Sequence, residues 1–307
     1  MQIKLSEKDL EKTLEKIEFK KSYPELVSKL INELQSKSNL IYEEISNIKS
    51  IIRRNIDHIF SNHVLTFKVE DLEYNQPIFG VDGSMVLIKG IGKKFFALVS
   101  VSQVIFERGS LDIENPKINL SVSMETIEEE YDANPKTQAI MKMMIGESKA
   151  INILINRFQR GIIFIDGPLI DPPNITDLNY VKYRAEVFKN ALKTNVDIIG
   201  FVKRYKSAQL ISKLDLKELS YSSDQEVVPI LFSMLRRNNY CNLSDVIATK
   251  PYPLDPEEDY YSHNVINLYK RFLNESGVTE DIYSSYIQVL YGVRPNKIEF
   301  FAKNRID

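Results

Sequence analysis

The sequence predicts an α/β fold, in which helices flank a mixed β-sheet and an N-terminal helical segment precedes it. Two long apolar segments, 78–88 and 95–106, are separated by KGIGKK, whose glycines favour the turn of a β-hairpin. Further along, segments 162–165 and 196–203 have the length and apolarity of buried strands and enclose a helical pattern at 177–193. A strand–helix–strand order is typical of a parallel crossover. A hairpin followed by such a crossover predicts a mixed sheet.

The composition indicates a globular protein. Of the 307 residues, 43% are hydrophobic and 27% are charged, and no apolar segment approaches the ~20 residues of a membrane-spanning helix. The polar N-terminal sequence is unlike a signal peptide, and the single cysteine, Cys241, excludes an internal disulfide and a cysteine-based zinc site. We therefore expect a cytoplasmic protein. The formal net charge of −2 excludes nucleic-acid binding through a basic tail but permits a local basic groove.

Residues 1–65 are predicted to form a helical or coiled-coil segment that precedes a larger domain at 75–307. Pro24 suits the first turn of a helix. Isoleucines then recur at steps of three and four, as on one face of a helix. They are Ile41, Ile45, Ile48, Ile52, Ile56 and Ile59. We expect this face to pack against the rest of the chain, a second copy or a partner.

The other segments complete the expected order of elements. Pro135 precedes a helical pattern at 136–160. The acidic and polar segment 107–135 is expected to be a solvated loop or a short helix. Residues 206–285 are expected to be mostly helical, with an exposed proline-rich loop, and 286–301 to form a final hairpin.

Three acidic residues occupy positions where the pattern favours apolar side chains. Asp82 lies inside the first strand, in VDGS, and Asp166 ends the strand that leads into IDGPL. The apolar face of the 136–160 helix contains one carboxylate, Glu147. We expect these acids to be buried, and a buried carboxylate is costly unless it is paired or holds a metal.

A shared location for the three carboxylates predicts a metal site. Ligands of α/β sheets bind beyond the C-terminal ends of parallel strands, and the glycines that follow Asp82 and Asp166 allow a close approach. Carboxylates that converge there repel one another unless a divalent cation neutralises them, and oxygen ligands favour Mg²⁺ or Mn²⁺. Such a cation can activate water for phosphoryl transfer. The alternatives are that both DG pairs mark turns and that Glu147 pairs with a lysine or arginine.

These motifs resemble the NurA nucleases, a family with an RNase H-like core. The resemblance rests on VDGS at 81–84, on Glu147 lying nineteen residues before Asp166, on IDGPL at 165–169 and on IIGFVK at 198–203. It extends over about 78–210. It implies an RNase H-like sheet and a nuclease that degrades DNA ends with Mn²⁺ or Mg²⁺.

The resemblance also implies roles and partners. Asp82, Glu147 and Asp166 would hold the metal, and Lys203, at the end of its strand, would contact the scissile phosphate. A homodimer is implied, together with a HerA-type hexameric ATPase that drives DNA to the nuclease in end resection, repair or phage defence. The family often has a histidine after its last strand, where this chain has none. The roles of His263 and Asp245 are therefore left open, as is the choice between one metal and two.

Other polar residues are candidates for contacts with DNA. Ser84 follows the DG pair, and the basic residues that could track phosphates are Lys203, Arg204, Lys206, Arg236 and Arg237. Tyr240, close to the last two, could stack on a single strand. With a net charge of −2, DNA affinity is expected to be weak and sensitive to salt.

Two other functions are compatible with the sequence. The first is a catalytically inactive RNase H-like module that docks on an ATPase ring, although such a module has no need of three core-facing acids. The second is another RNase H-like phosphoryl-transfer enzyme, which the short chain disfavours because it leaves no room for further domains that anchor nucleic acid.

Overall fold

The computed structural model describes residues 24–68, 74–128, 134–169, 178–203, 207–254, 270–271, 274–277 and 282–301. The chain divides into two units, 1–50 and 51–307. Helix α2 (Pro24–His63) begins at Pro24, as the sequence predicts. Within the first unit its leucines Leu30 and Leu34 are exposed. Within the second unit the isoleucine face is buried, and Ile52 and Ile59 have no exposed surface.

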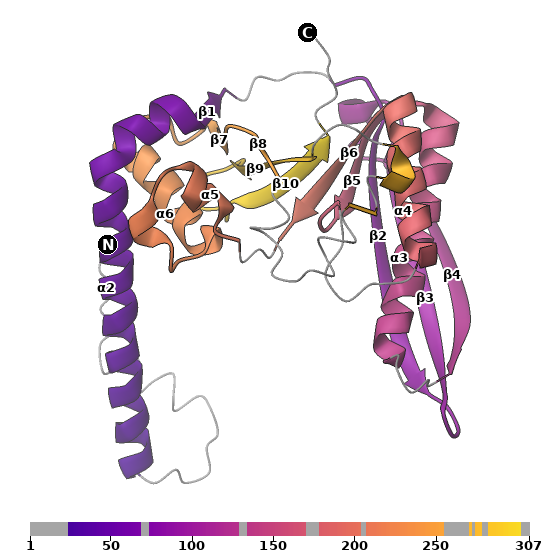
Figure 1. Ribbon diagram of the computed structural model, residues 1–307, viewed down its shortest axis with the longest axis horizontal. Coiled ribbons are helices and arrows are strands. Elements are labelled where there is room, and N and C mark those ends of the chain that lie inside the picture. The colour runs from indigo at the N-terminus through magenta and orange to yellow at the C-terminus, as the bar shows by residue number, and fades with distance from the viewer. Residues whose placement is uncertain are drawn as a thin grey trace. The chain divides into compact units, whose positions relative to one another are not determined.

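The second unit is built on one mixed sheet (Figure 1). Its strands lie in the order β1-β7-β9-β10-β6-β5-β2-β3-β4, and β8 pairs with β9. Their bounds are β1 Val64–Phe67, β2 Ile78–Lys89, β3 Lys94–Phe106, β4 Lys117–Glu128, β5 Arg160–Asp166, β6 Asn195–Val202, β7 Val246–Thr249, β8 Tyr252–Pro253, β9 Ile282–Gln288 and β10 Asn296–Phe301.

The strand order confirms the expected fold class. Strands β2, β3 and β4 form an antiparallel meander, and β5 and β6 add to β2 in parallel. An antiparallel meander continued by two strands parallel to its first member is the arrangement of the RNase H-like fold. The predicted hairpins are confirmed, since β9 and β10 also pair antiparallel.

Helices α3 (Pro135–Phe158) and α4 (Leu178–Lys193) cover one face of this sheet (Figure 1). Helix α3 begins where Asn134 accepts a hydrogen bond from the Lys136 backbone N–H at 2.9 Å. It ends at Gln159, which adopts a left-handed conformation with φ of 54°. Both helices lie where the pattern of the sequence placed them.

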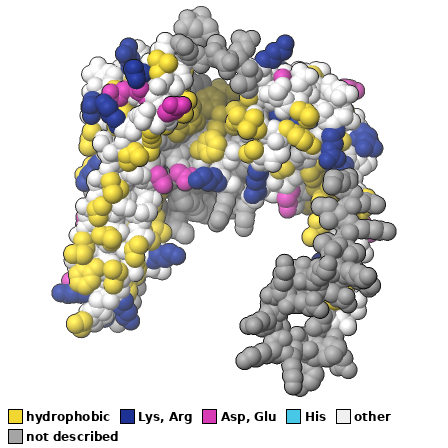
Figure 2. Space-filling view, turned by 180° about the vertical axis from the view of Figure 1, so that it is seen from behind, with side chains coloured by type: hydrophobic (Ala, Val, Ile, Leu, Met, Phe, Trp, Pro, Cys, Tyr) yellow, Lys and Arg dark blue, Asp and Glu magenta, His cyan; other side chains and the backbone are white. Residues whose placement is uncertain are grey.

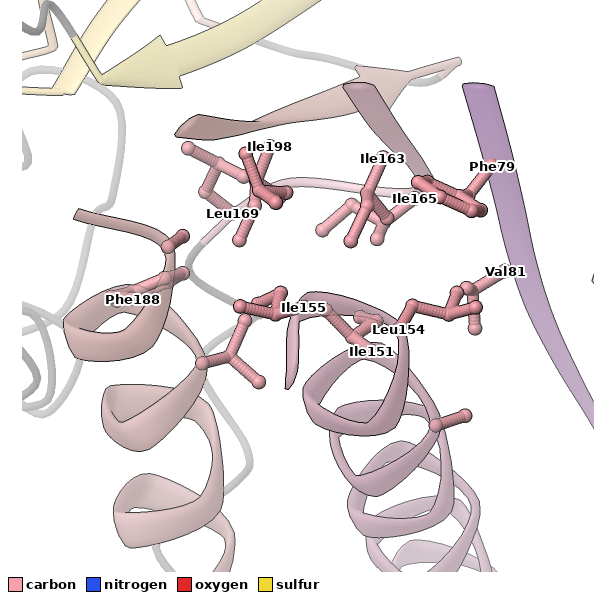
Figure 3. Close-up of a cluster of buried hydrophobic side chains, with 14 of the residues drawn as sticks. Phe79, Val81, Ile151, Leu154, Ile155, Ile163, Ile165, Leu169, Phe188 and Ile198 are labelled. Atoms are coloured by element: carbon pink, nitrogen blue, oxygen red, sulfur yellow. The ribbon is translucent and has the colours of Figure 1, made fainter. Parts of the chain in front are cut away.

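The core between helices and sheet is apolar and closely packed (Figure 3). The strands contribute residues that alternate along the chain, among them Phe79 and Val81 from β2 and Ile163 and Ile165 from β5. They face the α3 side chains Ile151, Leu154 and Ile155. Each such side chain contributes roughly 1.5–3 kcal/mol when fully buried. The residues that alternate with these core residues point away from α3, and they form a separate, open face of the sheet.

Two expectations from the sequence are wrong. The acidic segment after β3 contains a short 3₁₀ helix, η1 (Gly109–Asp112), and then the long edge strand β4 rather than a loop. In the described part of the segment expected to be mostly helical, α5 (Gln209–Lys213), η2 (Lys217–Leu219), α6 (Asp224–Arg237) and residues 270–271 and 274–276 are helical, but the segment also supplies strands β7 and β8. Among the described residues no helix is long and apolar enough to cross a membrane.

A buried carboxylate, Asp224, holds this second region together. Its oxygens accept hydrogen bonds from the backbone N–H groups of Leu210 and Ile211 and from the hydroxyls of Ser207 and Tyr286, at 2.8 to 3.1 Å. Burial raises the pKa of the Asp224 carboxyl above its ordinary value, while the four donors act to lower it. Asp224 thus joins α5, α6 and β9 through one side chain.

We expect Asp224→Asn to lower the free energy of unfolding by about 3 kcal/mol, because an amide cannot accept all four hydrogen bonds and buried donors are left unpaired. Urea denaturation measures this change. The matched control is Asp215→Asn, which removes the same charge from an exposed side chain and should change stability by less than about 0.5 kcal/mol. Equal effects of the two variants would contradict the role given to Asp224.

Candidate active site

Asp82 and Asp166 are neighbours on adjacent parallel strands. The register between β2 and β5 pairs Val81 with Ile165, so the two aspartates stand one residue further along their strands. Parallel strands lie about 4.8 Å apart, and side chains at matching positions point to the same face. The sequence motifs VDGS and IDGPL are thereby brought side by side.

Both aspartates are exposed, which corrects the expectation that they are buried. Alternation along β2 turns Phe79 and Val81 toward α3 and Asp82 toward the open face of the sheet. Asp166 follows Ile165 in the same way, and 39% of its side chain is exposed. Each carboxylate thus lies on a strand that is buried on one face only. The carboxylates point to the exposed face, where water can reach them.

Lys203 neutralises Asp166. Its ammonium nitrogen lies 2.6 Å from Oδ2 of that carboxylate, just beyond the end of β6. A backbone hydrogen bond holds the ends of β5 and β6 together beside this contact, since the Gly167 N–H donates to the carbonyl of Phe201 at 3.0 Å. Gly167 has a positive φ of 129°, which glycine adopts readily. The lysine that ends IIGFVK is therefore brought to the site.

Glu147 approaches from the other side of β2. A Cβ atom built on Gly83 would lie 2.5 Å from Oε1 of Glu147 and 2.8 Å from Cγ of Met143. The carboxylate of α3 therefore rests against the backbone of the residue that follows Asp82. Gly83 is required here because a larger side chain would push Glu147 away.

The loop after Asp166 is fixed by a buried ion pair. Glu299, 1% exposed, accepts a hydrogen bond from the Leu169 N–H at 3.0 Å, and the ammonium of Lys297 lies 3.5 Å from its other oxygen. A Cβ on Gly200 would lie 2.8 Å from the Gly167 carbonyl oxygen, so the loop and β6 are in close contact. Glu299 was not predicted from the sequence, although it is an acid in the apolar strand KIEFF.

The donor chemistry of the site fits a divalent cation. The available groups are carboxylate oxygens, which Mg²⁺ and Mn²⁺ prefer, and the ammonium of Lys203 shows that a cation is accepted beside Asp166. Within the described residues, no group of three or more acidic, histidine or cysteine side chains is arranged to hold a metal ion. Asp82 and Asp166 share one face, whereas Glu147 contacts the strand from the helix side.

A cavity of about 310 Å³ adjoins the two aspartates. Asp82, Asp166 and Lys203 line it together with the aromatic side chains of Phe164 and Phe201. The segment around Phe164 was expected to be buried, yet 37% of this side chain is exposed. Phe164 and Phe201 were missed because an isolated aromatic residue in an apolar strand is ordinarily part of a core.

The candidates for DNA contacts fall into different environments. The Ser84 hydroxyl lies 2.7 Å from that of Ser100 on the open face. Arg237 is exposed. Arg236 is 3% exposed, and its guanidinium donates to the carbonyls of Asn242, Leu243 and Asp245 and to the side chain of Gln288. Its donors are engaged inside the protein, which corrects the expectation that Arg236 contacts phosphates.

Three further candidates, Arg204, Lys206 and His263, lie outside the described residues. Asp245 is buried and accepts a hydrogen bond from the Asn242 N–H at 2.8 Å, so it closes the turn before β7. Tyr240 donates its hydroxyl to Asp57 and packs on Phe60 with ring centroids 5.0 Å apart.

Comparisons with known proteins show which family and which solved structures the chain is similar to. A family model described as the NurA domain matches residues 71–305. The crystal structure of the NurA nuclease from Sulfolobus solfataricus is similar at a TM-score of 0.57 and 12% identity, over 91% of this chain and 82% of that one. A further NurA crystal structure has a TM-score of 0.51 and 9% identity, over 88% of this chain and 86% of that one. No curated protein matches the chain.

The contact between Gly83 and Glu147 predicts an effect on stability. We expect Gly83→Ala to lower the free energy of unfolding by about 1–3 kcal/mol, because the new methyl group overlaps the Glu147 side chain and Met143. Gly80→Ala is the matched control in the same strand, since a Cβ there meets Val104 at an ordinary 4.0 Å. Urea denaturation of both variants measures the difference, and a Gly83→Ala protein as stable as Gly80→Ala would contradict the close approach.

Proposed function

The chain belongs to the NurA family, and we propose that it is a metal-dependent DNA nuclease that hydrolyses phosphodiester bonds at DNA ends. The observation that carries the proposal is the pair of adjacent carboxylates, Asp82 and Asp166, at the end of the parallel pairing between β2 and β5, with Lys203 beside Asp166. This end of a parallel sheet is where α/β proteins bind their ligands.

Asp82 and Asp166 would hold Mn²⁺ or Mg²⁺, with Glu147 as the third carboxylate. When bound, the cation supplies an acidified water and neutralises charge on the phosphoryl group. In the hydrolysis, the water oxygen bonds to phosphorus, one ester P–O bond breaks, and the departing oxygen gains a proton. The ammonium of Lys203, a compact cation on a flexible chain, would be suited to contact the phosphate beside Asp166.

The partners follow from the family and from charge. We infer a homodimer and a HerA-type hexameric ATPase as the partner that delivers DNA, in end resection, repair or phage defence. The net charge of −2 supports delivery by a partner, because the chain attracts DNA weakly by itself. Cleavage assays with and without the ATPase and ATP test this partnership. A larger domain at 75–307 would contain the nuclease, with 1–65 as a separate helical segment.

We expect Asp82→Asn and Asp166→Asn to reduce cleavage of end-labelled linear DNA by roughly 100- to 1000-fold, because each removes a charge that stabilises the metal and the transition state. Wild-type protein should be active with Mn²⁺ and inactive with EDTA. Asp215→Asn, which removes an exposed charge, should retain full activity. Cleavage in EDTA or by the Asp82→Asn protein would contradict the proposal, and a wild type inactive even with the ATPase would favour a docking module without catalysis.

Lys203 should have opposite effects on metal binding and on turnover. We expect Lys203→Met to bind Mn²⁺ at least as tightly as wild type, because the ammonium that competes for Asp166 is gone, while cleavage falls roughly 10- to 100-fold. Isothermal titration with Mn²⁺ and steady-state cleavage rates separate the two effects. A parallel loss of metal affinity and activity would show that Lys203 serves only to hold Asp166 in place.

A further inference from the structure

We propose that the cavity beside Asp82 and Asp166 is a pocket for one unpaired nucleobase, which stacks on Phe164. The inference rests on the proposed nuclease function and identifies the part of the substrate that the site recognises. It is carried by the strand register, by the exposure of Phe164, and by a glycine whose missing side chain creates the space.

The strand register places the pocket directly below the two acids. One row of residues across the open face contains Ser102, Asp82, Asp166 and Phe201. Ser102 pairs with Asp82, and Asp166 pairs with Phe201. Asp82 and Asp166 directly follow the paired residues Val81 and Ile165. The neighbouring row contains Val104, Gly80, Phe164 and Ile199. A nucleobase over Phe164 would therefore leave its sugar and phosphate within reach of the carboxylates.

Gly80 opens the space above Phe164. It pairs with Phe164 on one side and with Val104 on the other, and a Cβ built on it would meet only Val104, at 4.0 Å. A methyl group would therefore fit without overlap. Its absence leaves part of the 310 Å³ cavity open, a volume suited to one base with its sugar.

The lining has the character that a base requires. The two phenylalanines and Val104 supply apolar surface for a ring, and the charged groups Asp82, Asp166 and Lys203 stand at one side. Ligand pockets in proteins combine apolar walls with a few polar groups in this way. Because every base has a π-face, stacking on an aromatic side chain is strong and tolerant of sequence.

The pocket admits a base only when it is unpaired. A base inside a duplex is stacked and paired on both sides, so it must leave the stack to reach Phe164, at a cost of a few kcal/mol. A single-stranded end avoids this cost, and the end of a duplex must fray first. Phe164 and Gly80 thus determine specificity, and the acids act on the phosphate.

The test compares cleavage of a thymidine oligonucleotide with cleavage of the same backbone made of abasic residues. In Mn²⁺ the wild type should prefer the oligonucleotide with bases by roughly 10-fold or more in kcat/KM, as expected for one stacked base. Phe164→Ala, which removes the stacking surface, and Gly80→Val, which fills the cavity, should each bring this preference close to 1. Both variants should slow cleavage of the thymidine oligonucleotide more than cleavage of the abasic backbone.

Phe96→Ala is the matched control. Phe96 is also 37% exposed and lies on the same face of the sheet, but it does not line the cavity. This variant should keep the wild-type preference. The inference is overturned if Phe164→Ala and Gly80→Val retain the preference, or if they slow both substrates equally, because Phe164 would then only support the sheet. A wild type that cleaves neither substrate in Mn²⁺, even with the ATPase and ATP, would instead contradict the proposed nuclease function.

Binding gives a readout that does not depend on cleavage. The fluorescence of 2-aminopurine placed between abasic positions, where no neighbouring base quenches it, falls when the base stacks on an aromatic ring. Wild type and Phe96→Ala should quench it in Ca²⁺, and Phe164→Ala should not. Quenching that is unchanged in Phe164→Ala would overturn the base pocket even if the protein proved to be an active nuclease.

Discussion

The register between β2 and β5 is the constraint on which the site depends. Val81 opposite Ile165 places these two side chains and Phe79 and Ile163 in the core against α3, and it places Asp82 and Asp166 together on the open face. A slip by one residue would exchange the two faces of the strand, exposing the apolar set and forcing an acid under the helix. Each core side chain contributes roughly 1.5–3 kcal/mol, so the packing strongly opposes such a slip. The positions of the carboxylates are therefore fixed by the hydrophobic core beneath them.

The protein contains one exposed and one buried ion pair close to the site. Asp82 and Asp166 keep contact with water, and Lys203 neutralises one of them, so the open face tolerates two neighbouring acids. Glu299 is buried, and there the charge is held by Lys297 and by the N–H of Leu169. A buried pair of this kind is costly to break, because it leaves one charge without a partner. The exposed pair stays in contact with water, while the buried pair holds the loop that follows Asp166.

The sequence predicted the elements around the site better than it predicted their burial. The hairpin of β2 and β3, helices α3 and α4, and strands β5 and β6 all have strong patterns because one face of each is packed against a core. Strand β4 was mistaken for a loop because it lies at the edge of the sheet, where its exposed positions carry both polar and apolar residues (Figure 2). The exposure of Asp82 was not predicted, because the largely apolar sequence of β2 is typical of a strand that is buried on both faces, whereas Asp82 lies on a face that is exposed.

Two glycines of β2, Gly83 and Gly80, have different surroundings, and packing explains only one of them. Gly83 faces α3, where a methyl group would overlap Glu147, so a small residue is required by the fold. Gly80 faces the open side, where a methyl group meets nothing closer than 4.0 Å. A strand interior ordinarily gains from a larger side chain, since glycine loses more entropy and packs less surface. Packing explains the first glycine and not the second. The proposed base pocket accounts for it, because a side chain at position 80 would enter the space over Phe164 that the base would occupy.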